Sequence, residues 1–598
     1  MTLSVVDWVI IFIFFAVSLL IGVVVSRRAG NSSADFFLSG RQMPWWLLGV
    51  SMVATTFSTD TPNLVTDIVR QNGVSGNWVW WAFLLTGTLT TFVYAKLWRR
   101  SEVLTDIEFY EMRYSGRSAA FLRGFRTIYL GVFFNIVIMA SVTLAAIKIG
   151  GVMLNLTPFQ TVTIAAVITV FYSMLGGLTG VLITDFFQFS VAMFGSVMAA
   201  KIALSQPGVG GLTGLFSHPE VQGKLSMLPD FSDTKAAMAV FIIPLAVQWW
   251  SVWYPGSEPG GGGYMVQRML AAKDEKNAVA ATLFFNIAHY ALRPWPWIIV
   301  ALCSIVVYPD LASIKTAFPN ISDSIIKNDI AYPAMLTKLP SGLMGLVLAS
   351  LIAAYMSTIS THLNWGSSYI VNDYYKRFLK PGASEKELVL VGRISTAVLM
   401  AAACCLAPLL QNAGKAFYIM MQIGAGTGLL FILRWFWWRI SAASEIAAMA
   451  ASLIVAIYLE VLHPYLGMPE IDTTFKLIIG VAITTVCWVV VTLLTKPADE
   501  AKLISFYLKT QPGGPGWKNI RQKIKESGLE HPADESWEVP AGILCMLIST
   551  VGIYSGLFAT GYWIYAKHMH AIILTAVCAI SIAALINLWS RLRIKRQR

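Results

Sequence analysis

Charge is scarce in this sequence. Asp, Glu, Lys and Arg make up only 13% of the 598 residues, whereas 56% are hydrophobic, and the mean hydropathy is +0.64. Because a soluble globular domain carries about twice that share of charged residues, a soluble protein is excluded. We therefore expect a membrane protein whose spans each hold about 20 mainly apolar residues.

Cysteine is rare, and familiar catalytic motifs are missing. No strand-periodic region, P-loop, G-x-S-x-G elbow or H-E-x-x-H motif is found, so we predict neither an enzyme nor an ATP-driven pump. Channels, secondary transporters, receptors and sensors remain. The six cysteines lie in apolar stretches without metal-ligand spacing, and we interpret them as reduced packing residues: Cys303, Cys404, Cys405, Cys487, Cys545 and Cys578.

The charges that are present are unbalanced. There are 44 Lys and Arg against 32 Asp and Glu, which gives a net charge of +12. In a soluble protein this surplus would suggest a nucleic-acid partner. In a membrane protein it indicates basic cytoplasmic loops instead, so we predict a lipid bilayer as partner and no nucleic acid.

Apolar runs bounded by charges, Gly and Pro predict fifteen transmembrane spans. The first is a true span and not a cleaved signal peptide, because it lacks a basic segment before it and Arg27 and Arg28 follow it. The spans are expected at about 6–26, 44–70, 76–97, 122–153, 157–177, 182–204, 235–255, 276–307, 340–375, 388–410, 416–437, 444–462, 473–495, 540–563 and 570–590.

Basic residues fall on alternate loops, which sets the orientation of the chain. They place the N-terminus outside and the basic C-terminal tail inside. Segments 206–234 and 308–337 then face outside, and the polar segment 496–539 faces inside. The cytoplasmic loops hold Arg27, Arg28, Arg99, Arg100, Arg113, Arg117, Arg123, Arg126, Arg268, Lys273, Lys276, Lys376, Arg377, Lys380 and Lys386.

The second span is too polar in its middle for an unbroken helix. Residues 54–62 (ATTFSTDTP) combine hydroxyls, an acid and a proline near membrane depth. Pro62 removes a backbone donor and frees carbonyls near Phe57. Irregular backbone at this depth is tolerated only in a protein interior or at a wet cavity, and transporters use such breaks to bind ions. The alternative is a proline kink whose hydroxyls bond back to the helix.

A second polar strip lies on the ninth span. Ala354, Ser357, Thr358 and Thr361 stand at i, i+3, i+4 and i+7, so they share one helix face, and Ser360 widens the strip. Hydroxyl and carbonyl oxygens suit a small hard cation. Such strips also serve helix packing, and that alternative stays open at this point.

Three ionisable residues lie at or near membrane depth: Asp185 in the sixth span, and His289 and Arg293 in the eighth. Such residues indicate function by default. Asp185 has the alternative of an interfacial, solvated carboxylate. His289 and Arg293 lie one turn apart and would suit an anionic partner, whereas Arg293 has the alternatives of snorkelling or a structural ion pair.

With these features the sequence resembles the sodium:solute symporter family over residues 6–495. The resemblance rests on ordered motifs that are similar to those of the family. They are DFFLSGR at 35–41, DIEFYEMRY at 106–114, YSMLGGL at 172–178, TDFFQ at 184–188, and Q-R-x-L-A-A-K at 267–273.

The resemblance implies an all-α, LeuT-like fold in which five helices are repeated upside down and the first helix of each repeat is broken. It divides the chain into an extra helix with a connecting loop (1–43), the transport core (44–440), two more helices (441–495), a cytoplasmic loop (496–539) and two C-terminal helices with a basic tail (540–598).

The family's shared sodium site, carried over by alignment, has five positions here: Ala54, Phe57, Ala354, Ser357 and Thr358. The two polar strips would thus form one site. Some family members hold a second sodium ion, and the matching groups are Asp185, Ser360 and Thr361, with Ser357 shared. We therefore expect one or two Na⁺ ions.

The resemblance does not determine the solute. In sugar-carrying members a Lys contacts the substrate at the position of His289, and segment 249–264 is longer and more Gly-rich than usual. Interfacial tryptophans remain an alternative role for Trp249 and Trp250. The expected solute-binding residues are Thr56, Thr61, Trp249, Trp250, His289 and Gln422.

The sequence thus predicts a sodium-coupled symporter of the plasma (inner) membrane that imports a small polar solute, with a sugar or sugar-like molecule favoured. An amino acid or an organic anion is the second choice. A transporter-like membrane sensor comes third, because such sensors normally append signalling domains. Oligomeric state is not predicted.

Overall fold

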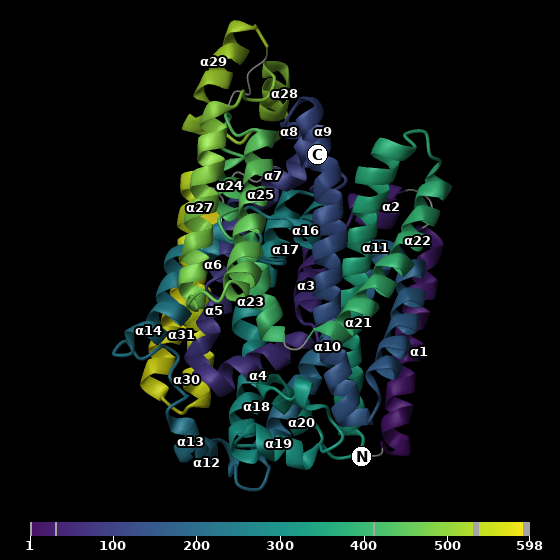
Figure 1. Cartoon of the computed structure of the whole chain (residues 1–598), viewed down its shortest axis with the longest axis vertical. Helices are drawn as coiled ribbons and strands as arrows, with labels where there is room; N and C mark the ends of the chain where they lie inside the picture. Colours follow the sequence, from purple (N-terminus) through teal and green to yellow (C-terminus); the bar gives the residue numbers. More distant parts are fainter. Residues whose placement is uncertain (1–2, 30–32, 411–412, 530–536, 590–598) are drawn as a thin grey trace.

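Long helices that run along one axis build this protein (Figure 1). The computed structural model describes residues 3–29, 33–410, 413–529 and 537–589. Within these ranges no β-strand is found, and ten helical stretches are long and apolar enough to cross a membrane. Of the other predicted spans, 44–70, 235–255 and 416–437 are divided by breaks into shorter pieces, whereas 6–26 lies within the single helix α1 (Val5–Ala29).

The first half of the expected core begins with a broken helix. α3 (Trp45–Thr56) ends inside the second predicted span and α4 (Asp60–Asn72) follows, as the polar middle of that span predicts. Gly177, with a φ of 53°, kinks the long helix α11 (Pro158–Leu204) between its two predicted spans. The remaining helices of this half are α5 (Trp78–Trp81), α6 (Leu84–Leu89), α7 (Ala95–Ser101), α8 (Phe109–Arg113), α9 (Gly116–Arg126) and α10 (Asn135–Leu154).

The second half also begins with a broken helix. Its outer part includes α14 (Thr234–Ala237) and ends with α15 (Trp249–Ser251), and its other part is α16 (Gly263–Ala271). The other helices of this half are α17 (Glu275–Ile287), α18 (Pro294–Val307), α21 (Leu343–Tyr369), α22 (Glu385–Leu406), α23 (Ala413–Gly424) and α24 (Gly428–Leu433).

The interruption between α23 and α24 holds the second break in place. The Trp253 amide donates to the Gly424 carbonyl (N–O 3.1 Å), and the Gly426 amide donates to the Ser251 carbonyl (N–O 2.8 Å). This close approach requires glycine, since a Cβ on Gly424 would lie 2.0 Å from the carbonyl oxygen of Trp253.

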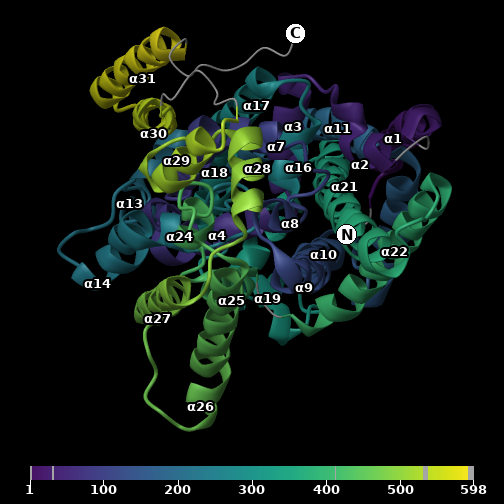
Figure 2. The same cartoon turned by 90° about the horizontal axis from the view of Figure 1, so that it is seen from above.

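Further helices surround the core. In the view from above, α30 and α31 project on one side, α25 to α27 on another, and α1 and α22 on a third (Figure 2). These peripheral and connecting helices are α1 (Val5–Ala29), α2 (Ser33–Leu38), α12 (Gly211–Ser217), α13 (Pro219–Gln222), α19 (Leu311–Ala317), α20 (Ala331–Leu336), α25 (Ala442–Ile457), α26 (His463–Tyr465), α27 (Thr473–Leu494), α28 (Glu500–Thr510), α29 (Lys518–Glu526), α30 (Val539–Ile564) and α31 (His568–Leu588).

The predicted loops separate to the two ends of the bundle. Helices α12, α13 and α19, from the segments predicted to face outside, lie at the bottom of Figure 1, and α28 and α29, from the segment predicted to face inside, lie at the top. We use "outer" and "inner" for these two ends below.

Candidate ion and solute site

The break between α3 and α4 supplies backbone oxygens in the protein interior. Phe57 leaves the helical conformation (φ −90°, ψ 77°), and its amide donates to the carbonyls of Val53 and Ala54. Ala54 and Phe57 are both buried. The ends of α3 and α4 therefore meet at buried carbonyl groups, the arrangement by which broken transporter helices coordinate cations.

The hydroxyl strip of α21 lies against this break. Thr358 Oγ1 donates to the Thr55 carbonyl at 2.8 Å and to the Ala354 carbonyl at 3.1 Å. Ser357 Oγ donates to Asp185 Oδ1 at 2.6 Å. Because both hydroxyl hydrogens are used in these bonds, the lone pairs of both oxygens remain for a cation. The two polar strips of the sequence thus come together, and their hard oxygen donors suit Na⁺.

Asp185 lies at the centre of a second polar group. The carboxylate is fully buried, and it accepts hydrogen bonds from Ser51 Oγ (2.5 Å) and Ser357 Oγ. Ser360 lies one turn from Ser357 and donates to its carbonyl (3.1 Å). The predicted second-site residues therefore share one interior region, and Asp185 is not a solvated interfacial group.

Arg268 enters the same region from α16. Its Nη2 donates to Thr361 Oγ1 at 2.8 Å, and its Nε and Nη2 lie 3.3 Å from Ser51 Oγ. Its Nη1 donates to Gln267 Oε1 (2.9 Å). The guanidinium thus contacts Ser51, whose hydroxyl donates to Asp185, and Thr361 of the α21 strip.

A cavity of about 120 Å³ lies beside the predicted sodium-site residues. Residues of the first break, of the second break and of α10, α21 and α23 line it. Three of the predicted solute-binding residues are among them: Thr56, Thr61 and His289. The other side chains that define its character are Ser58, Asp60, Trp80, Phe83, Tyr254, Ser257, Tyr264, Tyr290, Arg293, His362 and Phe417.

Aromatic rings enclose much of this cavity. The Tyr254 ring stacks on Phe83 at a centroid distance of 5.9 Å and meets the edge of Phe417 at 5.0 Å. Elsewhere in the lining, Trp80 stacks on Tyr290 at 5.9 Å. The cavity therefore offers flat apolar faces together with hydroxyl and carboxylate groups.

His289 and Arg293 form a closed network with Thr56. Arg293 Nη1 donates to Thr56 Oγ1 (3.1 Å) and Nη2 donates to His289 Nε2 (3.1 Å), while His289 Nδ1 lies 3.0 Å from Thr56 Oγ1. Because Nε2 accepts a hydrogen bond, these partners assign the proton of a neutral imidazole to Nδ1. Arg293 is thus held by protein groups and does not snorkel.

Three other expected solute-binding residues lie outside the lining of this cavity. The indole nitrogens of Trp249 and Trp250 donate to the carbonyls of Leu245 and Ala246 in the preceding turn. Gln422 lies near the end of α23 and donates to the Lys476 carbonyl (3.2 Å).

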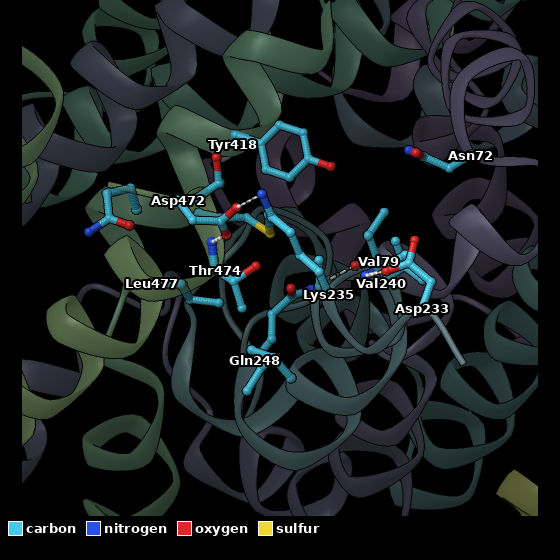
Figure 3. A pocket seen from close by; sticks show the side chains of 16 residues that line it. Asn72, Val79, Asp233, Lys235, Val240, Gln248, Tyr418, Asp472, Thr474 and Leu477 are labelled. Carbon is cyan, nitrogen blue, oxygen red and sulfur yellow. Dashed lines mark hydrogen bonds and ion pairs between the residues drawn. The ribbon is translucent and has the colours of Figure 1, made fainter. Parts of the chain in front are cut away.

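Gln422 lines a separate outer cavity of about 460 Å³. Figure 3 shows this cavity, with Lys235 reaching Asp472 (Nζ–Oδ2 3.5 Å) and the side chains of Tyr418 and Gln248 nearby. It lies between the outer end of α4, the start of α14, α23 and the start of α27, so it stands at the outer approach to the core.

Sequence reasoning missed several residues that the structure brings to these sites: Ser51, Tyr254, Tyr264, Arg268, His362 and Phe417. Arg268 was visible only as part of the Q-R motif and was interpreted as a basic loop residue. His362, two helical turns after Ala354 on α21, carried a weak signal as a polar residue in a span. The aromatic residues carried none, because aromatic rings are common throughout membrane helices.

Comparisons with known proteins identify the family of the chain. The family model of the sodium:solute symporter family matches residues 36–454. The sodium/glucose cotransporter of Vibrio parahaemolyticus is 27% identical over 493 residues, which cover 79% of this chain and 87% of that protein. The sodium/mannose cotransporter of Bos taurus is 27% identical over 518 residues (80% and 83%), and the sodium/myo-inositol cotransporter 2 of Homo sapiens is 25% identical over 496 residues (78% and 71%).

A solved structure supports the fold. The outward-open, substrate-bound Na⁺-coupled sialic acid symporter superposes with a TM-score of 0.63 at 20% identity, covering 83% of this chain and 99% of that one. The all-helical, LeuT-like architecture with broken helices that the sequence predicts is thereby confirmed. On the family match and this fold, the chain belongs to the sodium:solute symporter family and is a multi-pass membrane protein of sodium-coupled symport.

Proposed function

We propose that this chain imports a small neutral polyhydroxylated solute, a sugar or sugar-like molecule, together with sodium across the cell membrane. The observation that carries the proposal is the cavity wall itself. It combines the rings of Trp80, Phe83 and Tyr254 with the polar groups of Asp60 and Thr61. A sugar has apolar C–H faces that stack on rings and hydroxyls that bond to carboxylates.

The volume of the cavity limits the solute. At about 120 Å³ the cavity is smaller than the roughly 150 Å³ that holds benzene, so a monosaccharide, with about twice as many heavy atoms, enters only when the two breaks move apart. The similarity to cotransporters named for glucose, mannose and myo-inositol supports the same solute class.

Sodium binds at the junction of the first break and α21 in this proposal. Ala54, Phe57, Ala354, Ser357 and Thr358 hold the ion with carbonyl and hydroxyl oxygens. An ion shifts an equilibrium only by its different affinity for two states, so inward opening must separate α3 from α21 and weaken the site. A potential that is negative inside adds about 2.3 kcal/mol per 100 mV for each ion.

An amino acid or an organic anion is the second solute class. Arg293 would be its natural partner. Its Nη1 and Nη2 already donate to Thr56, His289 and the Val53 carbonyl, and only its buried Nε has no hydrogen-bond partner. Asp60 lines the same cavity and would repel an anion. These contacts favour a neutral solute, and the transporter-like sensor keeps the third place it has from the sequence.

Purified protein in proteoliposomes tests the proposal. We expect labelled D-glucose, D-mannose or myo-inositol to accumulate under an inward sodium gradient and not under an equal choline gradient, with proline and a sialic acid as comparison solutes. An inside-negative potential should increase the initial rate. Uptake that is indifferent to both sodium and potential would refute sodium coupling, and uptake of proline alone would refute the solute class.

A further inference from the structure

An apolar crevice of about 590 Å³ lies between α1, α10, α11 and α21. It is on the side of the bundle where α1 and α22 project (Figure 2). It shares no lining residue with the solute cavity or with the outer cavity. None of the described residues that line it is charged. The crevice is therefore a third site, and its chemistry differs from that of the other two.

The few hydroxyl groups in this crevice offer little to water. Those of Thr59, Thr161 and Tyr355 each bond to a neighbouring protein oxygen at 3.2 Å. Among the lining hydroxyls of the described residues, Thr169 Oγ1 alone has no hydrogen-bond partner. A buried water makes about three hydrogen bonds, so an apolar ligand suits the crevice better than water does.

The length of the crevice matches one leaflet of a bilayer. Its lining runs over residues 146–154 of α10, 161–169 of α11 and 348–356 of α21. Each of these stretches rises about 12 Å along its helix, at about 1.5 Å per residue. Half of the hydrocarbon core of a bilayer is about 15 Å thick. The lining also includes Leu3, beside the start of α1 at the outer end of the bundle (Figure 1), so the crevice belongs to the outer leaflet.

The mouth of the crevice opens toward lipid. Trp8 of α1 and Ile164 of α11 both line it, and they are 56% and 51% exposed. Because the chain is a multi-pass membrane protein, the crevice is continuous with the surface that contacts the bilayer. Its volume of about 590 Å³ is about four times the roughly 150 Å³ that holds benzene, which is enough for one acyl chain.

We propose that one acyl chain of an outer-leaflet phospholipid occupies this crevice as a structural ligand. Since no described lining residue is positively charged, nothing there would pair with the carboxylate of a free fatty acid. A phospholipid, in contrast, leaves its headgroup at the membrane surface. The deep end of the chain contacts Thr59 in the first break and Met356, the residue before the predicted sodium ligand Ser357. This inference goes beyond the proposed function and needs neither solute nor sodium.

Photolabelling in a bilayer tests the inference. The full-length protein is reconstituted into phosphatidylcholine vesicles that contain a phosphatidylcholine with a diazirine in one acyl chain, and labelled residues are identified by mass spectrometry. We expect label on Ile149 and Leu351, which line the crevice and are only 4% and 3% exposed. Label confined to exposed side chains such as Val398 (61% exposed) would overturn the inference, and this measurement needs no variant.

Ala165→Trp and Val167→Trp are a matched pair of variants on α11. Ala165 lines the crevice, so an indole there would fill it, whereas Val167 lies outside the lining and is 64% exposed. Label on Ile149 and Leu351 should be lost in Ala165→Trp and kept in Val167→Trp. A melting curve checks that each variant folds. Undiminished label on these two residues in folded Ala165→Trp would overturn the inference.

Native mass spectrometry gives a second readout. A phospholipid whose chain is buried in the crevice should remain bound after extraction into detergent, because its apolar contacts hold it. We expect Val167→Trp to retain as many phospholipids as the wild type and Ala165→Trp to retain one fewer. Equal phospholipid counts in all three proteins would contradict the proposal.

Discussion

The backbone groups in the two broken helices of the core have different partners. Between α3 and α4 the break is short, and the carbonyls around Ala54 and Phe57 face the hydroxyls of α21. Between α15 and α16 the break is long, and neighbouring groups occupy its backbone. Gly424 accepts from the Trp253 amide, and the Gly260 carbonyl accepts from the Trp98 indole (2.8 Å).

This difference indicates that the two breaks have different roles. The first break leaves oxygen atoms available to an ion that must bind and leave. The second break is fixed to the α23–α24 interruption and presents Tyr254 to Ser257 to the solute cavity. Variants in the second break should therefore act on folding and solute affinity, and variants at the first break should act on sodium.

The largest effect on stability is expected where the second break contacts the interruption between α23 and α24. In Gly424→Ala the new Cβ would lie 2.0 Å from the Trp253 carbonyl oxygen, a backbone atom that cannot rotate away. We expect a loss of stability of about 3 kcal/mol or more, seen as poor expression and a lower melting temperature in detergent. Gly382→Ala, with nothing within 4 Å of its Cβ, is the control. Equal melting temperatures for both variants would contradict a fixed second break.

Removing hydroxyls from the α21 strip should act on sodium alone. Ser357→Ala and Thr358→Ala each delete one proposed sodium ligand. Each should raise the sodium concentration for half-maximal uptake about tenfold, because a contact with a charged group contributes about that factor in affinity. Ser367→Ala, whose hydroxyl bonds back to Asn364 of the same helix, should leave it unchanged. An effect confined to solute affinity would show that the first break does not bind the ion.

Substitutions of residues that line the cavity should lower solute affinity, and by a smaller factor than the sodium variants change the sodium requirement. Thr56→Val leaves the groups of His289 and Arg293 without their shared partner, so we expect solute affinity to fall about fivefold. Tyr254→Phe removes one hydroxyl and keeps the ring, and it should cost less. Solute half-saturation at saturating sodium measures both. A larger loss for Tyr254→Phe would place the main polar contact on the second break.

The smallest effect is expected far from both breaks. Burial opposes ionisation of Glu111, but hydrogen bonds from Arg377 and Arg123 hold the pKa of this carboxylate below its usual value. The resulting stability is present above the unfolded pKa near 4.5 and is lost as pH falls through the folded pKa. For this partly exposed group we expect about 0.5 kcal/mol.

Glu111→Gln should therefore lower the melting temperature slightly at neutral pH and match the wild type once the carboxylate is protonated. Melting curves between about pH 3 and pH 7 measure this. A difference that grows toward acid pH would mean that the pair does not stabilise the fold.

Local patterns predicted much of what the structure contains. Pro62 and the hydroxyls beside it predicted the first break, and the i, i+3, i+4 spacing predicted the shared face of Ala354, Ser357 and Thr358. The alternation of basic loops agrees with the separation of segments at the two ends of the bundle. These features depend on residues that are near one another in the chain, so their physical causes are visible in the sequence.

The tertiary structure alone decided how distant groups combine. Arg268 was interpreted from the sequence as a loop cation, yet it docks beside Asp185, because α16 enters the bundle after a long break whose path no local rule gives. The pairing of Tyr254 in the second break with Phe83, between α5 and α6, and with Phe417 on α23 also joins three distant segments.

The sequence by itself therefore determined the membrane environment, the first break and the hydroxyl strip of α21, since hydropathy, proline and helical periodicity act over a few turns. Only the tertiary structure decided which oxygens face one another, which cation accompanies Asp185, and which aromatic rings enclose the cavity. Those contacts join residues far apart in the chain, 134 positions for Ser51 and Asp185, and they exist only once the helices pack.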